Sequence, residues 1–503
     1  MGNRFSDFWA SVRIFYSNFN ANYGRLFNAV IVLLLLSLVL YALVRAFLAG
    51  RKGRRSPSPL VTYEADPLLA DHAAESLARA IRIPSVTGET ARVREMARFL
   101  RERYPTAMKE LDCAVLPDGS MLLRWCSRQE SPLQPVLFCG HLDVVPGGED
   151  WTVCEPFDGL RQSGRIYGRG AMDCKGVVIA MLEAVENLIE QGHSPRRDIY
   201  FAFGSDEETG GYHGAAAIAR SLEEQGIKFD MILDEGGCFE DIECDGHTYS
   251  AAMIGLAEKQ RCEYRITAHC PGGHTSRPRR NTAVGVLSEA ICRIESAQPH
   301  HRMIPLVRQH LDAAISTFPF GKRFAVANKP LFGLLVSRVF RDDPDVMALI
   351  RTTIVPTRVD GSFPAANVLP TVASATFSAR LLPGDTPEKV LEDLQQLLAD
   401  LPVDVELTVA GEASFVTSQQ HPMYRLLLDV IQENHPKLPC IPTLMKADSD
   451  ARHYSNLTDC ILRFTPLVIG EEGGGNLHEG DEFLSERSLG IAVELYRSLL
   501  WKL

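Results

Sequence analysis

Histidine and acidic residues follow short apolar runs at several points in this sequence, and their types fit a metal centre. The apolar runs are Val136–Cys139, Ile199–Phe203 and Met231–Leu233. Each run is followed at once by potential ligands, which are His141 and Asp143, then Glu207 and Glu208, then Asp234 and Glu235. Such runs are typical of buried strands, and an open α/β sheet gathers its chemistry at the carboxyl ends of its strands. We therefore expect these side chains to share one site.

Two more candidates lie outside the strand ends. A glycine-rich turn, Tyr167–Gly176, carries Asp173 into an apolar helical stretch, and His478 stands in a polar segment near the end of the chain. Imidazole nitrogens and carboxylate oxygens are ligands that zinc accepts. Two histidines and several carboxylates dispersed in this way predict a pair of divalent ions, which we assign as two Zn²⁺ per chain.

The surrounding elements indicate an α/β catalytic domain interrupted by an inserted α+β domain. Helical and strand patterns alternate up to about Gly255, which is typical of an α/β domain. Between about 258 and 412 the order becomes β-α-β-α-β, which indicates the insert. We assign residues 65–257 and 413–503 to the catalytic domain and 258–412 to the insert. Residues 305–350, rich in Phe and Leu, are extra material that either lines an apolar channel or pads the insert.

An apolar stretch near the N-terminus predicts a single membrane-spanning helix. Residues 26–48 contain a nearly uncharged run that is long enough to cross a hydrocarbon layer of ~30 Å. The alternatives are a buried core helix and a cleaved signal peptide. The signal peptide is disfavoured because about 25 residues precede the run and no small-residue cleavage site follows it. We expect a tail over 1–25 and a linker over 49–64. Basic residues after the helix favour a cytoplasmic C-terminal part, although the side of the membrane stays unresolved.

Composition excludes some classes of protein. The formal net charge is -11 and no basic folded region stands out, which argues against nucleic-acid binding. The twelve cysteines form no Cys-x-x-Cys pair, so neither a zinc ribbon nor a compact disulfide framework is indicated.

The ordered motifs resemble those of a known family. They are His141-x-Asp143, Gly168-Arg169-Gly170-x-x-Asp173-x-Lys175-Gly176, Asp206-Glu207-Glu208-x-Gly210, Asp234-Glu235-Gly236 and the late His478. This set resembles the dizinc aminoacylase and carboxypeptidase family from about residue 65 to the end. Asp450-Ala451-Arg452-His453-Tyr454, Arg463-Phe464-Thr465-Pro466 and the extra segment most resemble carboxypeptidase S and the N-fatty-acyl-amino-acid synthase/hydrolase branch.

The resemblance implies roles for the candidate ligands. One zinc is held by His141 and Asp234, the other by Glu208 and His478, and Asp173 bridges them. Asp143 then fixes the tautomer of His141 as a neighbouring acceptor, and Glu207 is the general base. Glu235 competes with Asp234, because either carboxylate could face the metal.

The insert supplies further expected site residues. Pro271–Pro278 resembles a family turn whose histidine stabilises the oxyanion, often in a partner subunit, so His274 is a candidate for that role. Its alternative is a turn histidine bonded to local backbone. Asn367 and Arg380 resemble a pair that recognises the substrate carboxylate, and relatives often dimerise through the insert. Two positions depart from the family pattern, Glu479 after His478 and Asp448 two residues before Asp450.

The sequence thus predicts a membrane-anchored zinc amidohydrolase that cleaves or forms the amide bond of N-acyl amino acids, or cleaves small peptides at the C-terminus. One alternative is a catalytically silent scaffold of the same fold, which loss of a ligand would favour. Another is a dipeptidase, which would prefer a free α-amine. We expect a homodimer to be possible.

Overall fold

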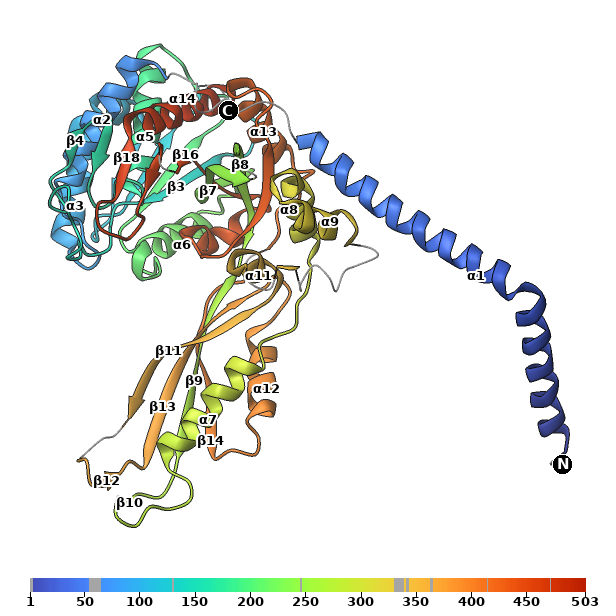
Figure 1. Ribbon diagram of the computed structural model, residues 1–503. Helices are drawn as coiled ribbons and strands as arrows, with labels where there is room; N and C mark the ends of the chain where they lie inside the picture. The colour runs from blue at the N-terminus through green and yellow to red at the C-terminus, as the bar shows by residue number, and fades with distance from the viewer. Residues whose placement is uncertain are drawn as a thin grey trace. The chain divides into compact units, whose positions relative to one another are not determined.

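The computed structural model describes residues 3–53, 65–128, 131–244, 247–329, 339–340, 343–361, 365–413, 415–470 and 472–503. The chain divides into two compact units (Figure 1). The larger comprises residues 56–313 and 343–503, and the smaller comprises residues 1–55 and 314–342. Each is described by itself.

An eight-stranded sheet forms the centre of the larger unit, in the order β1-β2-β6-β3-β7-β16-β8-β15. Its strands are β1 (Asp112–Val115), β2 (Met121–Trp125), β3 (Val136–His141), β6 (Ile199–Gly204), β7 (Met231–Cys244), β8 (His247–Glu258), β15 (Cys440–Met445) and β16 (Ile461–Ile469). Strands β6, β3, β7 and β16 run parallel. Every residue of β3 and β6 is buried, which explains their unbroken apolar sequences. The carboxyl ends of β3 and β6 therefore meet at one edge, next to residues 231–233 of β7. Strand β7 does not end after Leu233 as the sequence predicts, but continues through Asp234 and Glu235 to Cys244, because its second half pairs with β8.

Helices cover both faces of this sheet. They are α2 (Pro67–Ile81), α3 (Thr90–Arg103), α4 (Pro105–Glu110), α5 (Lys175–Glu190), α6 (Ala215–Glu224), α13 (Pro422–Asn434) and α14 (Glu486–Lys502). Helix α5 is buried along nearly its whole length between the sheet and helices α2 and α14 (Figure 1). On the opposite face, α6 and the 3₁₀ segment η3 (Asp450–Leu457) share an apolar cluster with the strands. The loops at the strand ends are thus held by packing on both sides.

A small antiparallel sheet joins two distant parts of the chain near the strand ends. It has the order β17-β18-β5-β4, with β4 (Leu160–Gln162), β5 (Arg165–Tyr167), β17 (Gly474–Gly475) and β18 (Phe483–Ser485). Strand β5 leads into the turn that carries Asp173, and His478 lies between β17 and β18. This sheet therefore brings Asp173 and His478 together.

The inserted segment forms a four-stranded antiparallel sheet, β11-β13-β9-β14, with two helices on it (Figure 1). Its elements are β9 (Gln260–His269), β10 (Gly273–His274), α7 (Ala283–Ser296), β11 (Thr353–Gly361), β12 (Val368–Leu369), β13 (Val372–Leu381), α12 (Pro387–Leu397) and β14 (Val403–Ala410). Five of them match the expected β-α-β-α-β order, whereas β11 and the short ribbon of β10 and β12 were not foreseen. The segment before β11 also contains α8 (Pro305–Ala313) and α11 (Pro344–Ile350). Outside the insert, the short 3₁₀ segment η1 (Glu207–Thr209) follows β6.

The smaller unit contains one long helix, α1 (Asn3–Gly53), with η2 (Ala314–Thr317) and α9 (Phe320–Ala327). Within α1, Leu26–Gly50 has a mean hydropathy of 2.7 and is long and apolar enough to cross a membrane. Only 6% of its most apolar window is buried, which does not fit a core helix. The expected tail over 1–25 is helical from Asn3, so α1 is longer than the predicted span. Of the expected linker, residues 54–64 lie outside the described part of the chain.

Candidate active site

His141 ends β3 and is held by Asp143. The imidazole is 1% exposed, and its Nδ1 donates to the Asp143 carbonyl oxygen at 2.9 Å. The same nitrogen lies 3.4 Å from the Asp143 carboxylate, which leaves Nε2 directed at the other candidate ligands. The Asp143 carboxylate also accepts hydrogen bonds from the backbone amides of Glu207 and Glu208, at 3.2 and 3.3 Å. Asp143 therefore positions both His141 and the acidic turn after β6.

Asp173 lies between the two histidines. Its Oδ1 is 2.8 Å from Nε2 of His141, and its Oδ2 is 3.0 Å from Nε2 of His478. Burial acts to raise the pKa of Asp173, but the hydrogen bonds from both imidazoles outweigh it and hold that pKa far below its usual range. A carboxylate with one oxygen toward each histidine has the geometry of a bridging ligand.

Within β7, the carboxylate that faces this group is that of Glu235. Its Oε2 lies 3.5 Å from Nε2 of His141. Asp234 instead accepts hydrogen bonds from the amides of Glu235 and Ala451, at 2.9 and 2.7 Å. The pairing of β7 with β16 skips two residues here, because Asp234 is opposite Arg463 and Gly237 is opposite Phe464. That bulge turns Glu235 toward His141, so the geometry favours the alternative that the sequence left open.

The donor atoms fit zinc. His141, Asp173 and Glu208 offer atoms within 4.8 Å of one another, and so do His141, Cys174 and Glu235. Donors around a tetrahedral ion with bonds of about 2.0–2.1 Å are separated by roughly 3.3 Å. Oε1 of Glu208 lies 3.5 Å from Nε2 of His478, is buried, and accepts no hydrogen bond from the described residues. A buried carboxylate oxygen without a donor is well explained by a cation beside it.

The loops that carry Asp173 and His478 are locked together by a buried ion pair. Nη1 of Arg169 donates to Glu482 at 2.7 Å, and both side chains are at most 3% exposed. The other oxygen of Glu482 accepts from the amides of Gly170 and Met172, at 3.1 and 2.9 Å. Sequence reasoning missed Glu482, although its place between a ligand and a strand could have marked it.

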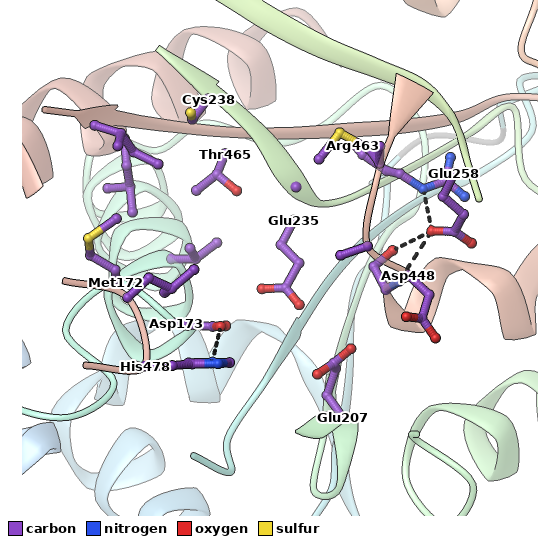
Figure 2. Close-up of a pocket in the computed structure, with 18 of the residues that line it drawn as sticks. Met172, Asp173, Glu207, Glu235, Cys238, Glu258, Asp448, Arg463, Thr465 and His478 are labelled. Atoms are coloured by element: carbon purple, nitrogen blue, oxygen red, sulfur yellow. Dashed lines mark hydrogen bonds and ion pairs between the residues drawn. The ribbon is translucent and has the colours of Figure 1, made fainter. Parts of the chain in front are cut away.

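Glu207 faces Glu235 across a cavity of about 450 Å³ (Figure 2). Burial, together with the negative charge of Glu235, raises the pKa of Glu207 well above its usual value. Burial likewise raises the pKa of Glu235 to about 7. Glu207 is therefore placed in the cavity with a high affinity for a proton, as a general base requires.

The cavity has two chemically different sides (Figure 2). One, which we call the apolar wall, carries Met172 and Cys238 in Figure 2, and Val177, Leu467, Ile469 and Leu477 are further apolar residues that line the cavity. The other, the charged wall, consists of Glu258, Asp448 and Arg463. Glu235 and Glu207 lie between the two walls in Figure 2, and His478 lies beside Asp173 on the side of Met172.

Arginines concentrate at the charged wall. Nε of Arg463 donates to Glu258 at 2.8 Å, and both residues are at most 2% exposed. The Asp448 carboxylate pairs with Arg380 from the insert through one oxygen. Its other oxygen accepts from Arg452 at 3.0 Å. The structure thus brings the predicted Arg380 to the cavity margin, together with Arg452 and Arg463, whose parts in this network the sequence did not reveal.

His274 and Asn367 lie apart from the cavity. Strand β10 pairs with β12, so that His274 is opposite Val368, and the amide of Thr275 donates to the Asn367 carbonyl oxygen at 3.1 Å. Nδ1 of His274 lies 2.8 Å from the Ser276 hydroxyl. His274 and Asn367 are exposed, and neither lines the cavity. Within one chain, the structure therefore does not bring these two residues to the metal ligands.

Fold and site together define a mixed α/β metallohydrolase, and comparison with known proteins agrees. The model of peptidase family M20/M25/M40 matches residues 137–502, and this chain belongs to that family. Among curated proteins, a probable carboxypeptidase S-like 2 from Dictyostelium discoideum is 35% identical over 407 residues, covering 80% of this chain and 78% of that one. The N-fatty-acyl-amino acid synthase/hydrolase PM20D1 of Xenopus tropicalis is 31% identical over 436 residues, covering 85% of each.

Solved structures show the same fold at low sequence identity. Human carnosine dipeptidase 1 superposes with a TM-score of 0.63 at 15% identity, covering 86% of this chain and 96% of that one. The metallo-carboxypeptidase Sso-CP2 of Sulfolobus solfataricus gives 0.61 at 15% identity, covering 85% and 98%. The family match and the relatives confirm two expectations from the sequence, the family itself and a hydrolase acting on amide or peptide bonds. Members of this family are metal-dependent and typically use zinc.

Proposed function

We propose that the chain is a membrane-anchored, zinc-dependent amidohydrolase acting on N-acyl amino acids, in either direction of the reaction. The observation that carries the proposal is the arrangement of the cavity, in which the candidate ligand Glu235 and the candidate base Glu207 lie between an apolar wall and a charged wall (Figure 2). An N-acyl amino acid has the same order of parts, because its amide bond lies between an apolar chain and a carboxylate.

Two zinc ions would occupy the centre. His141 and Glu235 would hold one, Glu208 and His478 the other, and Asp173 both, with Asp234 the less favoured alternative to Glu235. Bound zinc would lower the pKa of a water molecule and polarise the amide carbonyl. Three carboxylates beside two neutral imidazoles leave a residual positive charge on such a pair, which suits that task.

The protein groups would do the rest of the chemistry. Glu207 takes a proton from the attacking water and returns it to the nitrogen of the leaving amino acid. Arg380 binds the substrate carboxylate, and the acyl chain lies along the apolar wall. We assign oxyanion stabilisation to His274, assisted by Asn367, of a second chain in a homodimer, since both are exposed on the insert.

A substrate panel tests the proposal. The full-length chain in detergent with Zn²⁺ is assayed on N-oleoyl amino acids, N-acetyl amino acids and dipeptides with a free α-amine, and Glu207→Gln is the matched control. We expect turnover to be highest on the N-oleoyl substrates and reduced ~10²–10⁴-fold in the variant. Preference for dipeptides would replace the proposal with a dipeptidase, and equal or faster turnover of acetyl substrates would refute the role of the apolar wall.

A further inference from the structure

Residues 314–329 have the composition of a membrane-surface element. The sequence Ala-Ile-Ser-Thr-Phe-Pro-Phe-Gly-Lys-Arg-Phe-Ala-Val-Ala-Asn-Lys contains three phenylalanines and three basic residues, and no acidic residue. The absence of acidic residues continues in the sequence as far as Arg341, although the whole chain carries a net charge of -11. Aromatic and basic side chains together favour the interface of an anionic bilayer. We call residues 314–329 the basic aromatic segment.

The basic aromatic segment packs on the end of the apolar helix. Ala42 and Ala46 of α1 are at most 1% exposed and Gly50 is also buried, whereas Leu40, Phe47 and Leu48 are 51–63% exposed. The three buried residues recur every four positions, so they form one face of the helix. These small side chains let another backbone approach closely, as is common between helices in membranes.

Specific contacts fill that face. Nδ2 of Asn328, which is fully buried, donates to the carbonyl oxygen of Ala42 at 3.1 Å. A Cβ atom added to Gly50 would collide with the guanidinium of Arg323, which itself donates to the Phe318 carbonyl oxygen at 2.8 Å. Helix α9 thus lies against the C-terminal part of α1. Removing α1 by cleavage would uncover the buried amide of Asn328.

The surface of the segment carries the exposed ring of Phe320 and the partly exposed Lys322, whereas Arg323 is buried. Phe320 is 50% exposed. The rings of Phe318 and Phe340 meet edge to face at 5.3 Å, and the Lys322 ammonium lies 5.1 Å above the Phe340 ring. Because Phe340 is fully buried, these contacts hold the partly exposed Lys322 in place on the segment.

We propose that the basic aromatic segment is a second membrane-binding element, which lies in the interfacial layer of an anionic bilayer against the end of α1. The segment binds phospholipid, with Phe320 inserted at the boundary between headgroups and acyl chains and Lys322 near the headgroups. The apolar helix is accordingly a retained part of the protein and not a cleaved signal. The inference rests on the membrane anchoring in the proposed function, but not on the metal centre or the substrate.

Site-specific photocrosslinking tests it. The photoreactive amino acid p-benzoylphenylalanine replaces Phe320 in the full chain, reconstituted into phosphatidylcholine vesicles with and without phosphatidylserine. Leu40, 63% exposed on α1, is the positive control, and Val359, 60% exposed on β11, is the negative control. We expect lipid adducts at 320 and 40 but not at 359, with more adduct at 320 when phosphatidylserine is present.

The outcomes separate the two proposals. Lipid adducts at position 40 without lipid adducts at position 320 would overturn the membrane role of the basic aromatic segment. Equal lipid labelling at positions 320 and 359 would overturn it as well. No adduct at 40 would overturn the anchoring itself, whatever the enzyme activity. As a second test, Ala46→Leu places a larger side chain in the packed face and should reduce labelling at 320 several-fold. The exposed position Ala29 provides its match, and Ala29→Leu should leave labelling at 320 unchanged.

Discussion

Arg380 of the insert and Asp448 of the catalytic unit form an ion pair at the edge of the cavity, and Asp448 also binds Arg452. One carboxylate therefore faces two guanidinium groups, which leaves one net positive charge among the three. The neighbouring pair of Arg463 and Glu258 is neutral. The net positive charge available to a substrate beside the charged wall is therefore that of Arg380 and Arg452.

Arg380→Ala should weaken binding of substrates that carry a carboxylate. A hydrogen bond to a charged group contributes about 1.5–3 kcal/mol, so KM for an N-acyl amino acid should rise roughly 10–100-fold. Assays on the corresponding amino-acid amide, which lacks the carboxylate, serve as the comparison and should show little change. An equal rise in KM for both substrates would mean that Arg380 acts by supporting the structure.

Asp448→Asn should have the opposite effect. Removing the negative charge leaves Arg380 and Arg452 to attract the substrate, so KM for N-acyl amino acids should fall about 2–10-fold, since two charges ~4 Å apart in water interact by roughly 1 kcal/mol. Relative turnover of N-acyl glutamate, with its second carboxylate, should rise. An increase in KM would show instead that Asp448 is needed to orient Arg380.

Glu207→Gln should abolish most turnover without removing the metal. Loss of a general base costs ~10²–10⁴-fold in kcat. Because Glu207 is not one of the assigned ligands, zinc content measured by mass spectrometry should remain that of the unmodified protein. Loss of zinc along with activity would make Glu207 a ligand.

The neighbours Asp234 and Glu235 should behave differently. Glu235→Ala removes a carboxylate that faces His141, so zinc per chain should drop and activity with it. Asp234→Asn leaves a side chain that still accepts from the amide of Ala451, and it should retain zinc while lowering the unfolding temperature. The reverse pattern of zinc contents would restore Asp234 as the ligand.

Stability should fall with acid because of His310 on α8. Burial lowers the pKa of His310 to about 4. As the pH drops from about 6.5 toward 4, the unfolded chain therefore binds a proton that the folded chain refuses, and the stability present above pH 6.5 is lost at up to about 1.4 kcal/mol per pH unit. Urea unfolding at pH 7.5 and 5.0 should show a smaller difference in His310→Gln than in the unmodified chain. An undiminished difference would assign the acid sensitivity to other groups.

Local order was sufficient to predict that His141 and Glu208 lie close together. His141 ends one buried strand and Glu208 follows another, and parallel pairing of β3 with β6 brings these strand ends together. It was insufficient where a distant partner decides the geometry. The bulge that turns Glu235 inward depends on the pairing of β7 with β16, which is more than 200 residues further along the chain.

The insert and the N-terminus show the same difference between features that the local sequence determines and features that it does not. Both helices and three of the strands of the insert (β9, β13 and β14) follow their own periodicity and were predicted, whereas the position of His274 depends on a two-residue pairing with β12. Residues before Leu26 lack a continuous apolar pattern, so the local sequence did not predict that α1 begins at Asn3.

The last of the proposed ligands along the sequence, His478, lies between β17 and β18, far beyond the other four. A growing polypeptide on the ribosome would therefore contain four of the five proposed ligands long before the fifth has been synthesised. The proposed metal centre would be complete only after the segment that carries His478 has left the ribosome and paired with β5.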